Sequence, residues 1–194
     1  MKYIVTEGYT DAELLKAIFR AVELSDFRFS VAGGRSFVIS FAKSILVSRR
    51  LPVAVVIDAD TTDARHVREL ERTYFDLLHS VSGGVPFKIL VAAPTLDVVC
   101  FSYPDVLRRT LGVQLSESEL QQAKFKPTEV LLELMKKAGI ERPRSWFRRL
   151  DKTSALQLAH HPLIRSLIEF VKQPTTEVPD GSGPHATRYA ASGN

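Results

Sequence analysis

The sequence predicts an α/β fold, a mainly parallel four-stranded sheet between helices, with a helical appendage at its C-terminal side. Four short apolar segments, rich in β-branched residues, have the character of strands buried on both faces. These segments are 2–6, 28–32, 53–58 and 87–92. Helix-length segments separate them, and strand–helix–strand units of this size join parallel strands. After residue 111 the strand pattern disappears, which predicts that only helices follow.

The expected helices are placed by caps and by apolar spacing. Thr10 to Glu13 has the form of a capping box, and apolar residues follow it at helical spacing. Gly33 and Gly34 predict a turn before the apolar-periodic run 36–48, and 63–80 carries one apolar face. Beyond the sheet, Ser116 to Glu119 is a second capping box. Further helices are expected at 127–137, 143–150, 153–160 and 162–172.

This pattern divides the chain into three parts. Residues 1–111 form the α/β domain, 112–172 form a helical appendage packed on the sheet domain, and 173–194 form a tail. Pro, Gly, Ser and Thr dominate the tail and no apolar periodicity remains there, so we expect it to be disordered. No internal repeat is evident.

Composition excludes several classes of protein. No apolar run approaches the roughly 20 residues of a membrane helix, and the N-terminus lacks the order of a signal peptide, so no membrane partner and a cytoplasmic location are expected. The single cysteine, Cys100, cannot build a disulfide framework or a cysteine zinc site. Its apolar neighbours predict a buried structural thiol.

Positive charge is concentrated in the expected appendage. Residues 1–111 hold 14 Lys and Arg against 13 Asp and Glu, whereas 112–172 hold 11 against 7. A basic cluster surrounds Trp146 and Phe147, and basic residues with interleaved aromatic rings suit a phosphate backbone with stacked bases. The alternative is a solvated basic face with a buried aromatic edge. The cluster consists of Arg142, Arg144, Arg148, Arg149 and Lys152.

Acidic residues follow three of the expected strands. Glu7 comes directly after 2–6, Asp58 and Asp60 come at the end of 53–58, and Asp97 follows 87–92 by a few residues. Ligands of an open parallel sheet bind outside the carboxyl ends of its strands, so these acids can converge. Residues two apart on a strand point the same way, which predicts that Asp58 and Asp60 do so.

Carboxylates gathered at one place repel each other unless a cation neutralises them. Oxygen ligands suit hard ions, so the expected cofactor is Mg²⁺ or Mn²⁺, held by Glu7, Asp58, Asp60 and Asp97. Such ions hold phosphate oxygens and activate water. The alternative is that these acids only cap helices or lie in solvated turns. Asp11 remains open between an N-cap residue and an outer residue of the metal site.

Three motifs resemble the Toprim family. Ile4 to Asp11, with Glu7-Gly8 at its centre, is similar to the opening Toprim motif. Val31 to Gly34 resembles the family's glycine-bearing second strand end. Val55 to Asp60 resembles its Asp-x-Asp motif. The resemblance covers about residues 1–105. It implies a Rossmann-like parallel sheet between helices, with the Glu and the Asp pair at a metal site, in a style closest to OLD-type and ribosomal-RNA maturation nucleases.

Two departures from this resemblance matter. Thr61, Thr62 and Asp63 follow the Asp pair where many members have Gly, which argues against a primase. Asp58 to Thr62 also resembles the phosphatase motif of the haloacid dehalogenase family, in which the first Asp is a nucleophile. That motif usually lies on the first strand, whereas here a complete strand–helix–strand unit precedes it.

The leading functional hypothesis is therefore a small metal-dependent nuclease, a hydrolase of DNA or RNA phosphodiesters. Glu7, Asp58 and Asp60 form its catalytic site, and Arg35 together with the basic cluster binds the nucleic acid. The alternative is a non-catalytic or partner-dependent Toprim module. Because the chain contains no Walker A pattern, such a module would work with a separate ATPase subunit.

Overall fold

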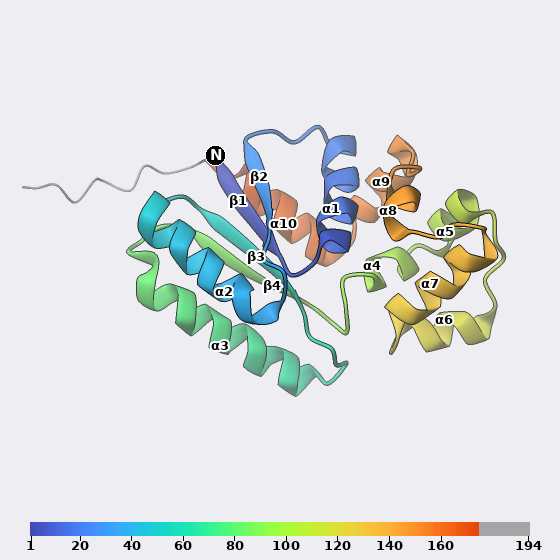
Figure 1. The fold of residues 1–194 in the computed structure, drawn as a ribbon, viewed down its shortest axis with the longest axis horizontal. Helices are drawn as coiled ribbons and strands as arrows, with labels where there is room; N and C mark the ends of the chain where they lie inside the picture. Colours follow the sequence, from blue (N-terminus) through green and yellow to red (C-terminus); the bar gives the residue numbers. More distant parts are fainter. Residues whose placement is uncertain (175–194) are drawn as a thin grey trace, which may run out of the picture.

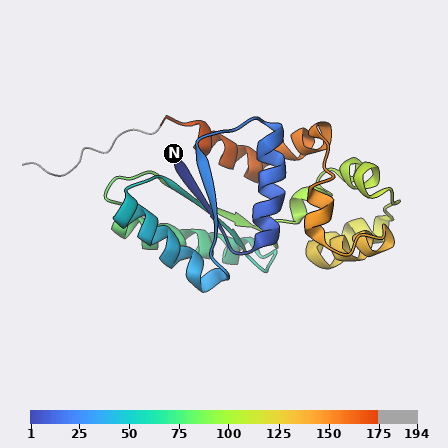
Figure 2. The same cartoon turned by 45° about the horizontal axis from the view of Figure 1, so that its top comes forward.

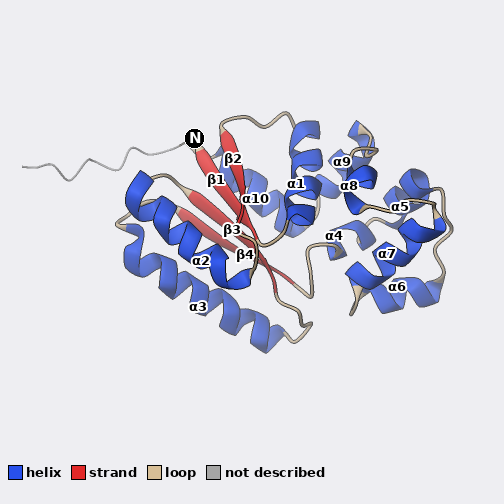
Figure 3. Ribbon diagram, viewed as in Figure 1, coloured by secondary structure: helices blue, strands red, loops and turns tan. Residues whose placement is uncertain are grey.

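The computed structural model describes residues 1–174 and contains a four-stranded parallel sheet between two layers of helices (Figures 1 and 3). The order of the strands is β2-β1-β3-β4. Each strand begins and ends within one residue of its predicted bounds, so the predicted α/β fold is confirmed. The strands are β1 (Lys2–Thr6), β2 (Phe27–Val31), β3 (Val53–Asp58) and β4 (Phe87–Ala92).

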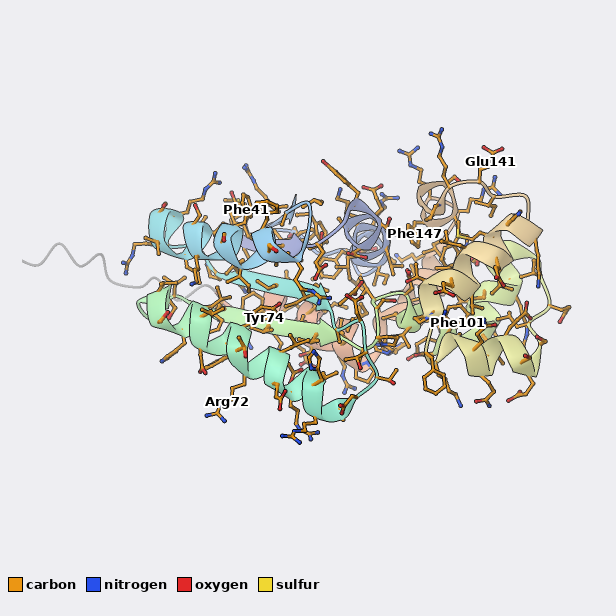
Figure 4. The ribbon with its side chains drawn as sticks, turned by 60° about the horizontal axis from the view of Figure 1, so that its bottom comes forward. Phe41, Arg72, Tyr74, Phe101, Glu141 and Phe147 are labelled. Atoms are coloured by element: carbon orange, nitrogen blue, oxygen red, sulfur yellow. The ribbon has the colours of Figure 1, made fainter. Side chains whose placement is uncertain are left out.

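Helices from the first half of the chain cover both faces of the sheet. Helix α1 (Tyr9–Ala21) lies on one face. On the other lie α2 (Arg35–Ser44), which continues into the π-helical turn η1 (Ile45–Arg49), and α3 (Ala64–Ser82). Figure 4 shows the layer formed by α2 and α3, with Arg72 of α3 pointing away from the sheet. The run predicted at 36–48 is therefore helical, with a change of winding at residue 45.

Alternation along the strands builds a separate core on each face. Ile4 and Val56 are buried against α1, whereas Val5 and Val55 are buried against α2 and α3. Because successive residues of a strand point to opposite faces, the same alternation assigns the last residues of each strand. Asp58 falls on the α1 side of the sheet, and Glu7, one residue past β1, falls on the α2 side.

The rest of the described chain is helical, as predicted. Ser116 Oγ accepts a hydrogen bond from Glu119 N at 3.2 Å, and Ser116 N donates to Glu119 Oε2 at 2.7 Å, which confirms the second capping box. Two short helices, α4 and α5, were not expected. The helices are α4 (Val98–Phe101), α5 (Pro104–Leu111), α6 (Glu117–Ala123), α7 (Pro127–Lys137), α8 (Pro143–Phe147), α9 (Lys152–Ala159) and α10 (Pro162–Lys172).

Most of these helices form a group beyond the carboxyl ends of the strands, but α10 returns to the sheet. It packs against β4, on the same face as α1 (Figures 1 and 2). His161 caps α10, since its Nδ1 accepts a hydrogen bond from Leu163 N at 3.3 Å. One continuous core therefore runs from α1 through the C-terminal helices.

Some expectations concern exposure rather than secondary structure. Cys100 is fully buried, as its apolar neighbours predict. Between residues 1 and 174 no helix is long and apolar enough to span a membrane. The disorder predicted from residue 173 on falls, apart from its first two residues, outside the described part of the chain.

A buried lysine joins the first strand to the last helix. The side chain of Lys2 is 4% exposed, and its Nζ donates hydrogen bonds to the carbonyls of Phe170 and Val171, both at 2.8 Å, and of Gln173. These are carbonyl groups at the C-terminal end of α10, which lack partners within the helix. A positive charge is also favoured there by the helix dipole. Lys2 therefore caps α10 and fixes it to the sheet.

Replacement of Lys2 by Met should destabilise the protein, because it leaves these carbonyls without their donor. We expect the free energy of unfolding to fall by about 1–3 kcal/mol, as for other buried polar groups that lose a partner. Urea unfolding followed by circular dichroism measures this loss. Lys172→Met, which changes an exposed lysine at the same helix end, is the control. Equal stability of the two variants would show that Lys2 does not cap α10.

Candidate acidic active site at the carboxyl edge of the sheet

Glu7 and Asp58 lie at the point of the sheet where the strand order reverses, between β1 and β3. From β1 the chain passes to β2 on one side, and it later returns to β3 on the other side. Strands β1 and β3 are direct neighbours, with Thr6 opposite Val56. Glu7, directly after β1, and Asp58, the last residue of β3, therefore lie at the same edge of the sheet. A switch point of this kind is where open α/β sheets bind their ligands.

The side chains of Asp58 and Asp60 point in different directions, so the prediction that they share one direction is wrong. Strand β3 ends at Asp58, and Asp60 has a left-handed backbone with φ of 54°, so strand alternation does not extend to it. The carboxylate of Asp58 accepts a hydrogen bond from Leu96 N at 2.8 Å. The side chain of Asp60 is 67% exposed and turns toward Arg35 on the α2 side.

Arg35 links the acids of β1 and β3. Its Nε lies 3.3 Å from Glu7 Oε1, and one terminal nitrogen lies 2.5 Å from Asp60 Oδ2. The same nitrogen donates to the carbonyl oxygen of Asp58 at 2.7 Å. Burial lowers the pKa of this guanidinium, but the bonds to Glu7 and Asp60 outweigh burial and leave the pKa above its usual value. We call Glu7 and Asp60 the outer carboxylates.

Three further carboxyl groups lie on the α1 side, and we call them the inner carboxylates: Asp11, Asp58 and Asp97. Asp11 occupies the third position of α1 and accepts a hydrogen bond from Gly8 N at 3.2 Å. The N-cap of α1 is therefore Gly8, and Thr10 lies inside the first turn of the helix, so the capping box predicted at Thr10 to Glu13 is wrong. Asp97 is 8% exposed and accepts a hydrogen bond from Thr128 Oγ1 of α7 at 2.7 Å.

The inner carboxylates share a cavity of about 520 Å³ with Glu7. The glycines of the predicted turn, Gly33 and Gly34, line it on the sheet side with φ of 82° and 138°. Helix α7 and the start of α8 close the opposite side. The lining residues that are not acidic are Gly8, Tyr9, Thr10, Val31, Gly33, Gly34, Thr128, Leu131, Leu132 and Pro143.

Burial and mutual repulsion make the inner carboxyl groups hard to ionise. Burial raises the pKa of Asp58 to about 8, and the charges of Asp11, Glu7 and Asp97 add to the effect. Burial likewise raises the pKa of Asp11 to about 6, with contributions from Asp97 and Glu7. The pKa of Asp97 is raised by burial against the opposing bond from Thr128. Such groups take up negative charge readily only when a cation is near.

The donor set suits a hard divalent cation, but the side chains are not gathered around one point. Within residues 1–174, no group of three or more His, Cys, Asp or Glu side chains is arranged so that it could hold a metal ion as it stands. The carboxylates have other partners instead. Arg35 forms ion pairs with Glu7 and Asp60, and Thr128 donates a hydrogen bond to Asp97. Carboxylate oxygens are nonetheless the ligands that Mg²⁺ and Mn²⁺ prefer. Binding therefore requires these partners to be exchanged.

In the basic cluster, three of the arginine side chains are exposed, but the two aromatic side chains are buried. Trp146 and Phe147 are 0% and 2% exposed, so the prediction that they could stack with bases is wrong. Trp146 Nε1 donates to Thr110 Oγ1 at 2.9 Å, and Figure 4 shows Phe147 between α1 and the C-terminal helices. Lys152 forms an ion pair with Glu23. The side chains of Arg142, Arg148 and Arg149 are exposed, and that of Arg144 is outside the described structure.

Several residues of the site could not be found from the sequence. Thr128 follows the proline that starts α7, and it bonds Asp97 across 31 positions of sequence. Leu131 and Leu132 belong to the apolar pattern of the same helix, although Leu132 is 47% exposed and lines the cavity. Tyr9, which is 75% exposed, directly follows the Glu7-Gly8 motif. Only its position beside that motif indicates, from the sequence, that Tyr9 lies at the site.

Solved structures with a similar fold include the C-terminal regions of two OLD proteins. That of the Burkholderia pseudomallei OLD protein has a TM-score of 0.56 and 18% identity, with 88% of this chain and 96% of that chain covered. That of the Xanthomonas campestris pv. campestris OLD protein has a TM-score of 0.52 and 17% identity, with 88% and 93% covered. The fold is Toprim-like. No family model and no curated protein matches the sequence. At these identities the likeness shows the fold.

The stability of the metal-free protein should fall as pH rises from about 4 to 8. Because the pKa of Asp58 is about 8 in the folded protein against an ordinary value of 3.8, the folded state holds a proton that the unfolded state releases. The contribution is complete below the unfolded pKa and is lost as pH passes through the folded one. Asp58→Asn should flatten this slope by up to about 1.4 kcal/mol per pH unit, the value for one proton.

Urea unfolding at several pH values in the presence of EDTA measures the slope. Asp76→Asn, which changes an exposed carboxylate on α3, should keep the slope of the wild type. A pH profile of Asp58→Asn that matches the wild type would show that Asp58 is not the group that holds the proton.

Proposed function

We propose that the protein is a metal-dependent nuclease that hydrolyses phosphodiester bonds of DNA or RNA. The observation that carries this proposal is the convergence of four carboxyl groups on one cavity at the switch point of the sheet: Glu7, Asp11, Asp58 and Asp97. Burying acids together destabilises the metal-free protein, as the raised pKa values of Asp11, Asp58 and Asp97 indicate. That cost favours a role in binding a cation.

Glu7, Asp58, Asp60 and Asp97 would hold Mg²⁺ or Mn²⁺, with Asp11 beside them. When bound, the ion supplies an activated water and neutralises charge on the phosphate. The chain orients the carboxylates for this task. Leu96 N holds one oxygen of Asp58, and Thr128 holds one oxygen of Asp97. Because Asp58 retains a proton up to about pH 8 without a metal, loading releases that proton, and affinity for the metal should rise with pH.

Nucleic acid would reach the cavity across the start of α8. Pro143 lines the cavity, and the exposed side chain of Arg142 directly precedes it. Arg148 and Arg149 are exposed a few residues further along. Arginines at such positions bind phosphates without regard to sequence. The OLD neighbours support a nuclease-type module of this kind.

A second candidate is a partner-dependent Toprim module that acts with a separate ATPase. It is favoured by apolar side chains exposed away from the cavity. Phe37 and Phe41 lie one turn apart on α2 and are 63% and 41% exposed, and Val47 in η1 is 59% exposed. Residues four apart on a helix share a face, and exposed apolar faces are typical of contacts with other proteins.

Replacement of the acids should abolish cleavage without unfolding the chain. The assay incubates the protein with plasmid, single-stranded DNA and structured RNA in Mg²⁺ or Mn²⁺. We expect Asp58→Ala, Asp60→Asn and Glu7→Gln each to lose activity by at least about a hundredfold, because the ion that activates water is lost. Asp76→Asn should cleave like the wild type, and circular dichroism should show that every variant is folded.

Full activity in an acid variant would contradict the proposed function. Inactivity of the wild type toward every substrate, with activity restored by an added ATPase partner, would favour the second candidate. In that case Phe37→Ser should prevent restoration.

Removal of the exposed arginines should weaken binding to all nucleic acids alike. Each phosphate that a basic side chain neutralises releases counterions, so the double change Arg148→Ala and Arg149→Ala should reduce the dependence of log affinity on log salt by about 1–2 units. A salt titration in Ca²⁺, which holds back cleavage, measures this slope. The matched control changes Arg165, an exposed arginine of α10, to Ala. An unchanged slope would mean that this segment is only a solvated helix face.

A further inference from the structure

Arg35 occupies the position at which a cation would join the acids of β1 and β3. Its guanidinium lies 3.3 Å from Glu7 and 2.5 Å from Asp60, and these two outer carboxylates follow different strands. By contrast, the inner carboxylates are held by Gly8 N, Leu96 N and Thr128, which are uncharged groups. The positive charge of Arg35 is thus directed at the outer half of the site.

A guanidinium and a divalent cation compete for the same oxygens. Both are positive, so they repel each other at contact distance, and each carboxylate has a limited set of lone pairs. This competition keeps Glu7 and Asp60 bonded to Arg35 and away from the inner carboxylates in the metal-free protein. Glu7 can turn toward a metal at the inner carboxylates only after its bond to Arg35 is broken.

The surroundings of Arg35 allow it to leave. Its side chain is 34% exposed, so solvent reaches it. It is the first residue of α2, directly after Gly33 and Gly34, which line the cavity and have open space where a Cβ would lie. Open space therefore lies beside the backbone that carries Arg35, at the edge of the cavity. A planar guanidinium released there is suited to a phosphate group, which it binds with two parallel hydrogen bonds.

We propose that Arg35 is an exchangeable counterion: it holds Glu7 and Asp60 in the metal-free protein and transfers to a nucleic-acid phosphate when divalent cations bind. This inference rests on the proposed function and adds a positioning residue to it. In the metal-free protein, the charge of Arg35 offsets the repulsion between the outer carboxylates. It also couples loading of the metal to binding of the substrate, because the metal frees the group that receives the phosphate.

The first test is calorimetric titration of Mn²⁺ into the wild type, Arg35→Gln and Arg35→Lys. Arg35→Gln should bind Mn²⁺ about tenfold more tightly, the size expected when a charge-assisted hydrogen bond no longer has to be broken. Arg35→Lys keeps the charge and should stay close to the wild type. Arg108→Gln, which removes an arginine paired with Asp105 on α5, should leave affinity for Mn²⁺ unchanged.

The second test measures binding of single-stranded and duplex DNA in Ca²⁺ across a range of salt concentrations. Arg35→Gln should bind both more weakly and reduce the salt slope by about 1, as for loss of one phosphate contact. Arg35→Lys should restore the slope, and Arg108→Gln should match the wild type. The two tests together predict opposite changes from one substitution, tighter metal and weaker nucleic acid, which a purely structural role of Arg35 would not produce.

Unchanged or weaker Mn²⁺ binding by Arg35→Gln would overturn the proposal, as would an unchanged salt slope. These results are separable from the fate of the nuclease. Cleavage by the wild type together with either result removes the role of Arg35 and leaves the proposed function. Both predicted shifts without cleavage of any substrate would remove the nuclease and leave Arg35 as the exchangeable counterion.

Discussion

Negative charge is held in a confined space at the carboxyl edge of the sheet, and the other features of the site depend on how it is balanced. Asp11, Asp58 and Asp97 are largely withdrawn from water, and the charges of Asp11 and Asp97 raise the cost of ionising Asp58 further. Backbone amides and one threonine compensate only part of this cost, while the charge of Arg35 serves the outer pair. A protein gains nothing in stability from such a cluster. Binding of a cation to these acids would offset that cost.

The fold makes this concentration of charge possible. In the order β2-β1-β3-β4, the strands that precede Glu7 and Asp58 are adjacent and parallel, so residues about fifty positions apart meet. Strand alternation then separates them by face: Asp58 joins Asp11 of α1, and Glu7 joins Arg35 of α2. The C-terminal helices complete the cavity through Thr128 and Pro143. The sheet thus supplies the acids, and the helices beyond it limit their contact with water.

The strands and the acidic edge could be predicted because both depend on local patterns. The run 53–57 is apolar throughout, and acids mark the carboxyl ends of β1 and β3: Glu7 directly follows β1, and Asp58 is the last residue of β3. What could not be predicted depends on backbone conformation or on distant contacts. The left-handed conformation of Asp60 separates it from Asp58, although their spacing suggested a shared direction. Thr128 carries no motif, and Trp146 is buried by helices whose packing no local pattern specifies.

The most direct test of a cation site at this edge is a crystal structure of the protein grown with Mn²⁺, with anomalous diffraction data to locate the ion. We expect an anomalous peak between the carboxylates of Glu7 and Asp58, at metal–oxygen distances of about 2.0–2.3 Å, with the guanidinium of Arg35 turned away from Glu7. A well-ordered edge of the sheet with no peak there, and with Arg35 still bound to Glu7 and Asp60 at saturating Mn²⁺, would contradict it.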